Sequence, residues 1–207
     1  MGMQMSIRWR LLGLAVVLLV AFSACSPIVI VPDKALESAI RAEIRKPLSL
    51  FLTQRDLEGV RKLNASNLRT KIKDLEGLQY CVNLNQLNLT DNRITDISQV
   101  GNLSKLVRLH LGNNQIMDIE AIAGLLALEY LDLSGDGNAI TDWRHLEANV
   151  LNGGLGMDSV VRVPALHTLR SDGNPLPGFV GAFEAMANAG VVVDYGAGFD
   201  VDSGNGG

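Results

Sequence analysis

The sequence predicts an α/β solenoid, with parallel β-strands on a concave face and short helical turns on a convex face. The first observation is that leucine recurs every 22 residues, in the three series Leu84, Leu106 and Leu128; Leu87, Leu109 and Leu131; Leu89, Leu111 and Leu133. The second is that other residue types keep the same period, namely Asn92 and Asn114, Ile94 and Ile116, Ile97 and Ile119. A fixed period of this length is typical of stacked repeats, because one repeat alone cannot bury its own apolar face.

Within each repeat the chain follows the pattern LxxLxLxxNxIxxI. The last two leucines of LxxLxL are two residues apart, so both point to the same side of a strand, and that side must be the interior. The pattern resembles the leucine-rich repeat. The 22-residue form, with aspartate and isoleucine after the asparagine turn, resembles the bacterial internalin type.

The asparagine that follows each strand turns the chain. Its side-chain amide can bond backbone groups that the turn leaves unpaired, which buried backbone requires. We therefore expect a structural ladder of stacked asparagines, formed by Asn92, Asn114, Asn138 and Asn174.

Aspartates precede the outer turns at Asp74, Asp96, Asp118 and Asp142. We interpret them as caps of tight helical turns, since a short carboxylate can accept backbone N–H groups there; the alternative is a metal site. A second acidic group, from Asp132 to Asp142, does not have the spacing of an EF-hand calcium loop. The histidines lie far apart and without paired cysteines, so we predict no metal and no cofactor.

Residues 1–24 are typical of a secretory signal, with Arg8 and Arg10 before a short apolar run from Leu11 to Phe22. The string Phe-Ser-Ala-Cys that ends at Cys25 resembles a bacterial lipobox. The resemblance implies a lipoprotein signal peptide, lipid attachment at Cys25 and membrane anchoring, since several acyl chains anchor stably. The alternative is an ordinary secretory signal. By resemblance to Gram-negative lipoproteins, Ser26 favours the outer membrane over the inner membrane of the cell envelope.

Residues 25–32 are predicted as a tether and residues 33–59 as a helical N-terminal cap over the open end of the solenoid. Asp33 is a good N-cap for a helix that we expect to end near Lys46 and Pro47. Thr53, with Asp56 three residues on, starts a second helix. Since an amphipathic helix beside a lipid anchor could also lie on a membrane, that alternative stays open.

Repeats and a helix–strand C-terminal cap are predicted for residues 60–195, with a long loop at 147–163 where the leucine pattern lapses. We expect the repeat to recover at Leu166 and Leu169, a helix over 179–189, and a last strand over 191–195. Residues 196–207 are too rich in glycine and aspartate to bury a core and are predicted to be disordered.

The chain has 207 residues and a net charge of −4, and removal of residues 1–24 would leave 16 basic against 22 acidic residues. This acidic balance, without a basic stripe, argues against nucleic-acid binding. Cys81 falls in register with Leu103, so we expect it to be a small buried apolar residue.

The strand residues that do not face the core form rows on the concave face. The first row is predicted to hold Lys62, Gln86, Arg108, Tyr130 and Thr168; the second Asn64, Asn88, His110, Asp132 and Arg170; the third adds Thr90, Gly112 and Ser134. Tyrosine and arginine are enriched at interface hot spots. We therefore predict contact with an unknown protein partner through Arg108, Tyr130, His110, Asp132, Gln86 and Asn88.

His110, Asp132 and Ser134 could in principle act as base, orienting group and nucleophile. A flat strip of strands offers no enclosed pocket and no oxyanion or phosphate site, so we predict no enzymatic activity and no catalytic residue. The leading hypothesis is a monomeric, lipid-anchored envelope protein that binds a protein through its concave face. The alternative is a structural or glycan-contacting envelope component that uses its convex face or loop 147–163.

Overall fold

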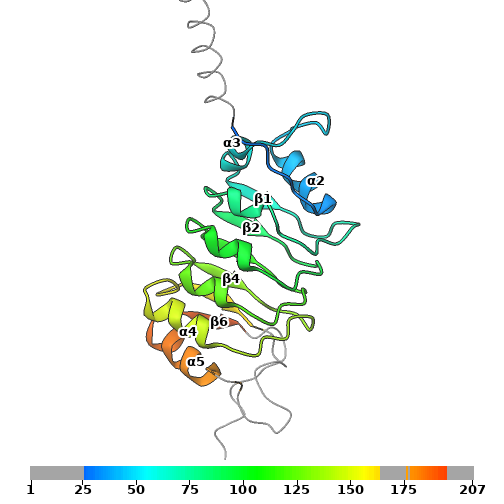
Figure 1. The fold of residues 1–207 in the computed structure, drawn as a ribbon. Coiled ribbons are helices and arrows are strands. Elements are labelled where there is room, and N and C mark those ends of the chain that lie inside the picture. The colour runs from blue at the N-terminus through cyan, green and yellow to red at the C-terminus, as the bar shows by residue number, and fades with distance from the viewer. Residues whose placement is uncertain (1–25, 164–175, 177, 195–207) are drawn as a thin grey trace, which may run out of the picture.

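A computed structural model describes residues 26–163, 176 and 178–194 of this chain. One parallel sheet in the order β1-β2-β3-β4-β5-β6 runs along the whole described solenoid, so neighbours in sequence are neighbours in space (Figure 1). Its strands are β1 (Lys62–Asn64), β2 (Gln86–Asn88), β3 (Arg108–His110), β4 (Tyr130–Asp132), β5 (Val160–Arg162) and β6 (Val192–Asp194). The predicted α/β solenoid is confirmed.

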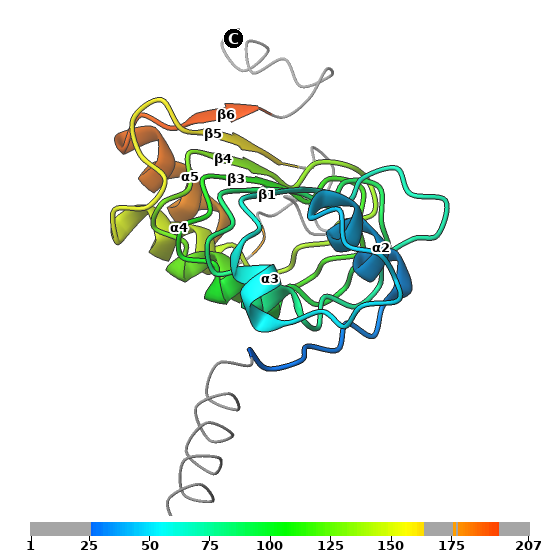
Figure 2. The ribbon, with the colours of Figure 1, turned by 90° about the horizontal axis from the view of Figure 1, so that it is seen from above.

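Helices form the side of each coil away from the sheet, as the view along the solenoid shows (Figure 2). 3₁₀ helices lie in the regular repeats, and α-helices lie towards the two ends. They are α2 (Lys34–Glu43), α3 (Gln54–Glu58), η1 (Leu78–Tyr80), η2 (Ser98–Asn102), η3 (Glu120–Gly124), α4 (Arg144–Leu151) and α5 (Phe179–Asn188).

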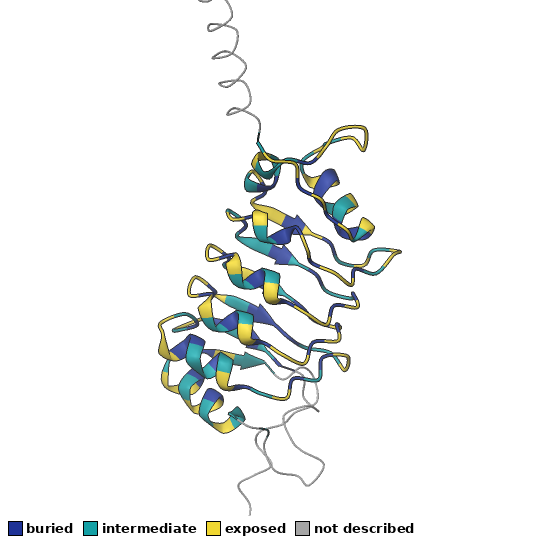
Figure 3. Ribbon diagram, in the orientation of Figure 1, coloured by how far each residue is buried: buried dark blue, intermediate teal, exposed yellow. Residues whose placement is uncertain are grey.

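The core lies between the sheet and these helices. The middle residue of each of the first five strands is fully or almost fully buried, in the series Leu63, Leu87, Leu109, Leu131 and Val161. Figure 3 colours the strands by burial; the residues beside these strand centres are partly or fully exposed, except Asp132, which is buried. Because side chains alternate across a strand, one buried residue leaves two outward-facing residues in each three-residue strand.

The asparagine ladder has one pattern of hydrogen bonds that repeats from coil to coil. The Asn92 side chain donates to the carbonyl oxygens of Ala65 and Leu89, and its oxygen accepts from the Ile72 N–H. Asn114 and Asn138 repeat this arrangement one and two coils further along. Each amide therefore joins its own turn to the preceding one. The fourth expected member, Asn174, lies outside the described residues.

Four aspartates accept hydrogen bonds from backbone N–H groups at the start of the outer turns. The side chains of Asp74, Asp96, Asp118 and Asp142 each accept a hydrogen bond from the backbone N–H two residues further on, at 2.8–3.0 Å. Asp142 also pairs with the Arg144 guanidinium, which lowers the pKa of its carboxyl to about 2. These carboxylates satisfy N–H groups that the helical turns leave unpaired.

The N-terminal cap differs from the prediction in the place where its first helix ends. Helix α2 begins after Asp33, whose side chain accepts from the N–H groups of Ala35 and Leu36, but it ends at Glu43. Arg45 adopts a left-handed conformation there, so the helix stops before Lys46 and Pro47. The apolar face of α2, with Leu36 and Ile40, is fully buried, so it covers the first repeat and is not available to a membrane.

Residues 26–32 are more than a tether. Ile28 forms an antiparallel bridge with Thr53, and Val29 and Val31 are buried in the core. Thr53 itself caps α3 in the predicted box with Asp56. The segment therefore lies against the start of α3 as part of the cap.

The carboxyl half holds the largest departure from the sequence prediction. The fifth strand is Val160–Arg162, with Leu131 paired to Val161. Leu166 and Leu169, where the sequence predicted that the repeat recovers, lie outside the described residues. Part of the predicted loop 147–163 is helix α4, which buries Leu146 and Val150. The repeat is not lost there: it is lengthened by a full helix, and Val161 and Val163 take the inward positions of leucines.

The C-terminal cap consists of α5 and β6, close to the predicted helix and strand. Phe179, at the start of α5, makes an edge-to-face contact with Trp143 at 5.5 Å between ring centroids. Gly190 ends the helix with a positive φ of 76°, and β6 then pairs in parallel with β5. The cap thus continues the sheet by one strand.

Candidate functional site

The outward-facing residues of the sheet form two rows, which together we call the concave face. Strand register places Lys62, Gln86, Arg108, Tyr130, Val160 and Val192 in the first row, and Asn64, Asn88, His110, Asp132, Arg162 and Asp194 in the second. Neighbouring strands lie about 4.8 Å apart, so side chains in a row touch. Each row follows the predicted order as far as β4.

Beyond β4 the predicted rows are wrong. Val160 and Arg162 occupy the places that the sequence assigned to Thr168 and Arg170, which lie outside the described residues. The spacing of Val161 and Val163 on either side of Arg162 was the available signal for this strand. It is weak because valine replaces the leucine on which the repeat pattern depends.

Arg108, Tyr130 and His110 come together at the middle of the concave face. The rings of His110 and Tyr130 lie 4.7 Å apart between centroids, and Arg108 is the register partner of Tyr130 on the adjacent strand. Arg108 is exposed, while both rings are half-buried. The strands therefore place one cationic and two aromatic side chains next to one another.

Burial lowers the pKa of His110 below its usual value, and the charges of Arg108 and Arg162 add to this. The carboxylate of Asp132 acts in the opposite direction and is outweighed. His110 is therefore neutral at pH 7 and can both donate and accept a hydrogen bond.

A hollow of about 350 Å³ opens at the amino-terminal part of this face. The predicted contact residues Gln86, Asn88, Arg108 and His110 line it, together with Lys62 and with Glu43 from the end of α2. Glu43 could not be predicted as part of this hollow, because its place depends on how the cap packs on the first repeat. The lining offers hydrogen-bond donors, acceptors and both signs of charge.

Two of the predicted contact residues form hydrogen bonds with the turns that follow their strands. Asp132 is only 7% exposed, and its side chain accepts from the N–H and from the hydroxyl of Ser134. The Asn88 side chain likewise accepts from the Thr90 N–H. Asp132 therefore ends β4 and presents little surface to a partner, while Asn88 keeps a part-exposed amide.

The catalytic arrangement that we considered is not assembled among the described residues. The Ser134 hydroxyl donates to Asp132 at 2.6 Å and so is not directed at His110. Cys81 is buried, which raises the pKa of its thiol to about 12 and keeps it protonated. No group of three potential metal ligands is found in the parts of the chain that the structure describes.

Arg162 and Asp194 are site residues that the sequence analysis missed. The Arg162 guanidinium donates to the Asp194 carboxylate at 2.8 Å, and this bond, with a further one to Tyr130, raises the pKa of Arg162. The pair joins β5 to β6 and supports Tyr130 from the side opposite Arg108. Its position could not be read from the sequence without the correct register of β5.

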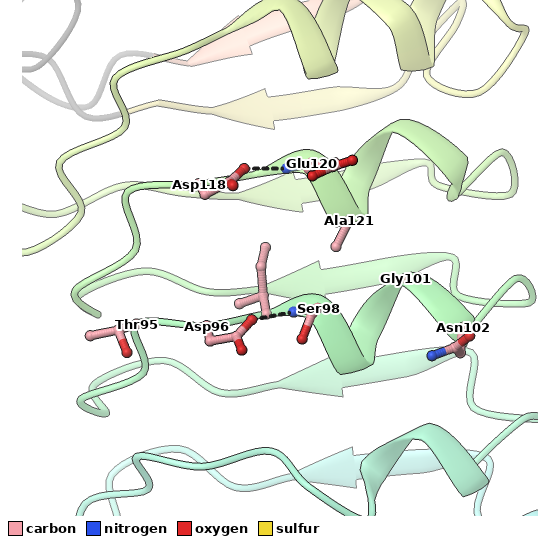
Figure 4. A pocket seen from close by; sticks show the side chains of 9 residues that line it. Thr95, Asp96, Ser98, Gly101, Asn102, Asp118, Glu120 and Ala121 are labelled. Atoms are coloured by element: carbon pink, nitrogen blue, oxygen red, sulfur yellow. Dashed lines mark hydrogen bonds between the residues drawn. The ribbon is translucent and has the colours of Figure 1, made fainter.

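The convex side has a hollow of its own, of about 530 Å³, between η2 and η3 (Figure 4). Asp96 and Asp118 face it, but both carboxylates are used by backbone N–H groups, as the dashed lines show. Apart from Ile97, the rest of the lining is small or polar, and it includes no aromatic side chain.

Membrane attachment is not visible in the folded part of the chain. No helix between residues 26 and 194, as far as these residues are described, is long and apolar enough to span a bilayer. The predicted lipid-attachment residue Cys25 and the signal segment before it lie outside the described residues.

Comparisons with known proteins agree on one kind of repeat. Residues 82–140 match the family described as Leucine rich repeat. The structure is similar to an internalin, InlF, from Listeria monocytogenes, with 31% identity and a TM-score of 0.63 over 83% of this chain and 46% of that one. A second Listeria monocytogenes internalin, InlC2, gives 36% identity and a TM-score of 0.53 over 60% of this chain and 53% of that one. The chain thus spans about half the length of these solved proteins. No curated protein sequence matches it.

Proposed function

This chain is an internalin-like leucine-rich-repeat protein, and from that premise we propose that its concave face binds a protein partner. Proteins of this fold usually act as interaction scaffolds, and that analogy gives the class of function but not the site. The proposal has no enzymatic step. The chain alone would supply the binding surface, as a monomer and without a cofactor.

One observation carries the proposal, namely the cluster of Arg108, Tyr130 and His110 at the centre of the concave face. Arginine and tyrosine contribute disproportionately to binding energy at protein interfaces. Here the rings of Tyr130 and His110 are already in contact, so little side-chain entropy is left to lose on binding. The polar hollow beside them, lined by Gln86 and Asn88, provides hydrogen-bonding groups that select the partner.

A pull-down with chemical cross-linking from intact cells tests this surface. Replacing both Arg108 and Tyr130 with alanine should weaken capture of the partner at least about hundredfold, since each hot-spot residue is worth about 2 kcal/mol or more. The captured protein is identified from the wild-type sample by mass spectrometry. The double variant must show the wild-type circular dichroism and melting curve.

A matched control comes from exposed residues that lie off the concave face. Replacing Arg93 and Met117, which are exposed on the edge between strands and convex helices, should leave capture unchanged. Equal capture by the wild type and by the Arg108→Ala, Tyr130→Ala variant would overturn the concave assignment.

We further propose that the chain is anchored in a bacterial envelope by lipid on Cys25, with the outer membrane favoured if the envelope has two membranes. The support is the lipobox-like string before Cys25 and the closeness of this residue to the start of the folded cap at Ser26. A tether this short would hold the solenoid next to the membrane.

Labelling cells with radioactive palmitate tests the anchor directly. The wild-type chain should carry the label and enter the detergent phase, whereas Cys25→Ser should carry none, because serine lacks the thiol that accepts the lipid. Cys81→Ser serves as the control, since this buried thiol should not affect labelling. Label that persists in Cys25→Ser would contradict the proposal.

The alternative is a structural or glycan-contacting role for the convex face or for the segment 147–163. The hollow between η2 and η3 is the observation that favours it. It is the weaker candidate because the two aspartates there are bonded to backbone and because both ends of segment 147–163 belong to α4 and β5. Retained capture by the concave double variant, with loss on Glu120→Ala, would favour the alternative.

A further inference from the structure

The amino-terminal end of the solenoid exposes an unusual number of large apolar side chains. They belong to the segment 26–32 and to the loop between α2 and α3, and they are Ile28, Ile30, Leu48, Leu50 and Phe51. Ile30 and Phe51 are 77% and 73% exposed. We call these five residues the apolar end patch. The loop that carries three of them projects beyond α2 and is coloured largely as exposed in Figure 3.

Strand pairing puts part of the patch on one face. Ile28 bridges Thr53 in antiparallel fashion, and the Val29 N–H donates to the Leu52 carbonyl at 2.9 Å. Val29 and Leu52 point into the core. Because side chains alternate along paired strands, Ile28, Ile30 and Phe51 must point outward together.

The loop is held so that its apolar side chains remain outside. The buried Arg41 guanidinium donates to the carbonyl oxygens of Pro47 and Leu50, at 3.0 and 2.9 Å. Its charge is balanced by Glu37 on the preceding turn of α2. Leu48 and Leu50 are thus exposed on a loop whose backbone is tied to the helix, rather than on a free segment.

Large apolar side chains gathered at one end of a soluble domain indicate a contact surface. Cys25 precedes this patch by only three residues, since Ile28 is its first member. A lipid on Cys25 would therefore enter the bilayer within a few residues of Ile28 and Ile30. The exposed Arg45 and Arg55 lie in the same part of the chain, where they would meet anionic headgroups.

We propose that the apolar end patch rests in the surface of the lipid bilayer and so holds the solenoid upright on its anchor. The proposal rests on the lipid anchor that is part of the proposed function. Its consequence is geometric: one end of the solenoid is fixed to the membrane, and the concave face stands perpendicular to it and open to a partner. A lipid alone, on a flexible linker, would leave that orientation free.

Fluorescence quenching by brominated lipids tests the orientation. The full chain, made with its own leader and lipidated in a bacterial host, is reconstituted into vesicles of phosphatidylethanolamine and phosphatidylglycerol with brominated acyl chains. Phe51→Trp places an indole in the patch, while Leu151→Trp places one on α4 at the far end, where residue 151 is equally exposed. The native Trp143 is fully buried and gives a constant background.

The indole at position 51 should be strongly quenched and the one at position 151 should not. Adding Ile30→Asp to the Phe51→Trp chain should reduce the ratio of docked to free orientations at least about tenfold, since burial of one such side chain is worth about that factor. Ile30→Val, which keeps an apolar surface, should leave the quenching nearly unchanged.

Mass spectrometry of the amino-terminal peptide separates the possible failures. If Cys25 carries lipid but position 51 is not quenched, or both positions are quenched alike, the docking proposal is overturned and the anchor stands. If position 51 is unquenched and Phe51→Asp converts a dimer into a monomer, the patch joins two copies instead. Absence of lipid on Cys25 would overturn the anchor, and the docking proposal with it.

Discussion

Replacing Trp143 with alanine is expected to lower the free energy of unfolding by about 3–5 kcal/mol, the range for removal of a buried tryptophan. Trp143 is fully buried where α4 begins, and it contacts Phe179 of α5 edge to face. It therefore joins the last regular coil to the C-terminal cap. The cavity left by alanine should loosen α4 and α5 together, because they pack on each other and on this ring.

Trp143→Phe provides the matched comparison. The indole N–H of Trp143 has no hydrogen-bond partner among the described residues, so phenylalanine loses volume but no hydrogen bond. Its cost should be less than half of the cost of alanine. Leu151→Ala, at an exposed site on the same helix, should change stability by about 0.5 kcal/mol or less. Urea unfolding followed by circular dichroism measures all three, and equal effects of alanine and phenylalanine would contradict the packing argument.

The middle of the solenoid could be predicted residue by residue because its pattern is redundant. The register of β1 to β4 follows from the leucine series, including the longer first repeat that pairs Leu63 with Leu87. Each coil presents the same positions to the same neighbours, so an error at one leucine is corrected by the next. The capping roles of Asp33 and Thr53 were also predictable, since they depend on residues three positions apart.

The prediction failed where one coil departs from the others. Between Leu131 and Val161 the chain inserts α4, and its inward residues change from leucine to valine. The leucine pattern therefore predicted the next strand at Leu166 and Leu169 instead. The buried side-chain amide of Asn149 donates to the carbonyl oxygens of Ile122 and Leu125. This contact with the preceding coil could not be predicted from any local sequence pattern.

Part of the candidate site was predictable, because side chains alternate regularly along each strand. Strand alternation identified Arg108, Tyr130 and His110 as outward-facing neighbours. It could not show that Asp132 would be covered and bonded by Ser134, because burial within an outward row depends on the turn that follows. The apolar end patch was equally hidden, since it is created by the pairing of two segments more than 20 residues apart in sequence.

Asn114→Ala is expected to lower the free energy of unfolding by roughly 1–3 kcal/mol. The Asn114 amide is buried, donates to the carbonyls of Leu89 and Leu111 at 3.0 and 2.9 Å, and accepts from the Ile94 N–H at 3.1 Å. Alanine leaves the Ile94 N–H without a partner inside the protein, at a cost of about 1–3 kcal/mol. The two carbonyls lose one of their two donors but keep the side-chain amides of Asn92 and Asn138. Thermal and urea unfolding, followed by circular dichroism, would measure the loss.

The loss of stability in Asn114→Ala should extend to both neighbouring coils of the solenoid. Each amide joins two consecutive coils, and a solenoid is stabilised mainly by the interfaces between such neighbours. Hydrogen exchange should therefore show increased opening at the backbone N–H groups of both Ile94 and Gln115, on either side of the substitution. Asn102→Ala, at an exposed position at the end of η2, removes an equal side chain and should leave stability and exchange unchanged. If Asn114→Ala unfolds like the wild type, the stabilising role of the asparagine ladder is contradicted. Water would then replace the missing amide, and the stacked leucines alone would hold the coils in register.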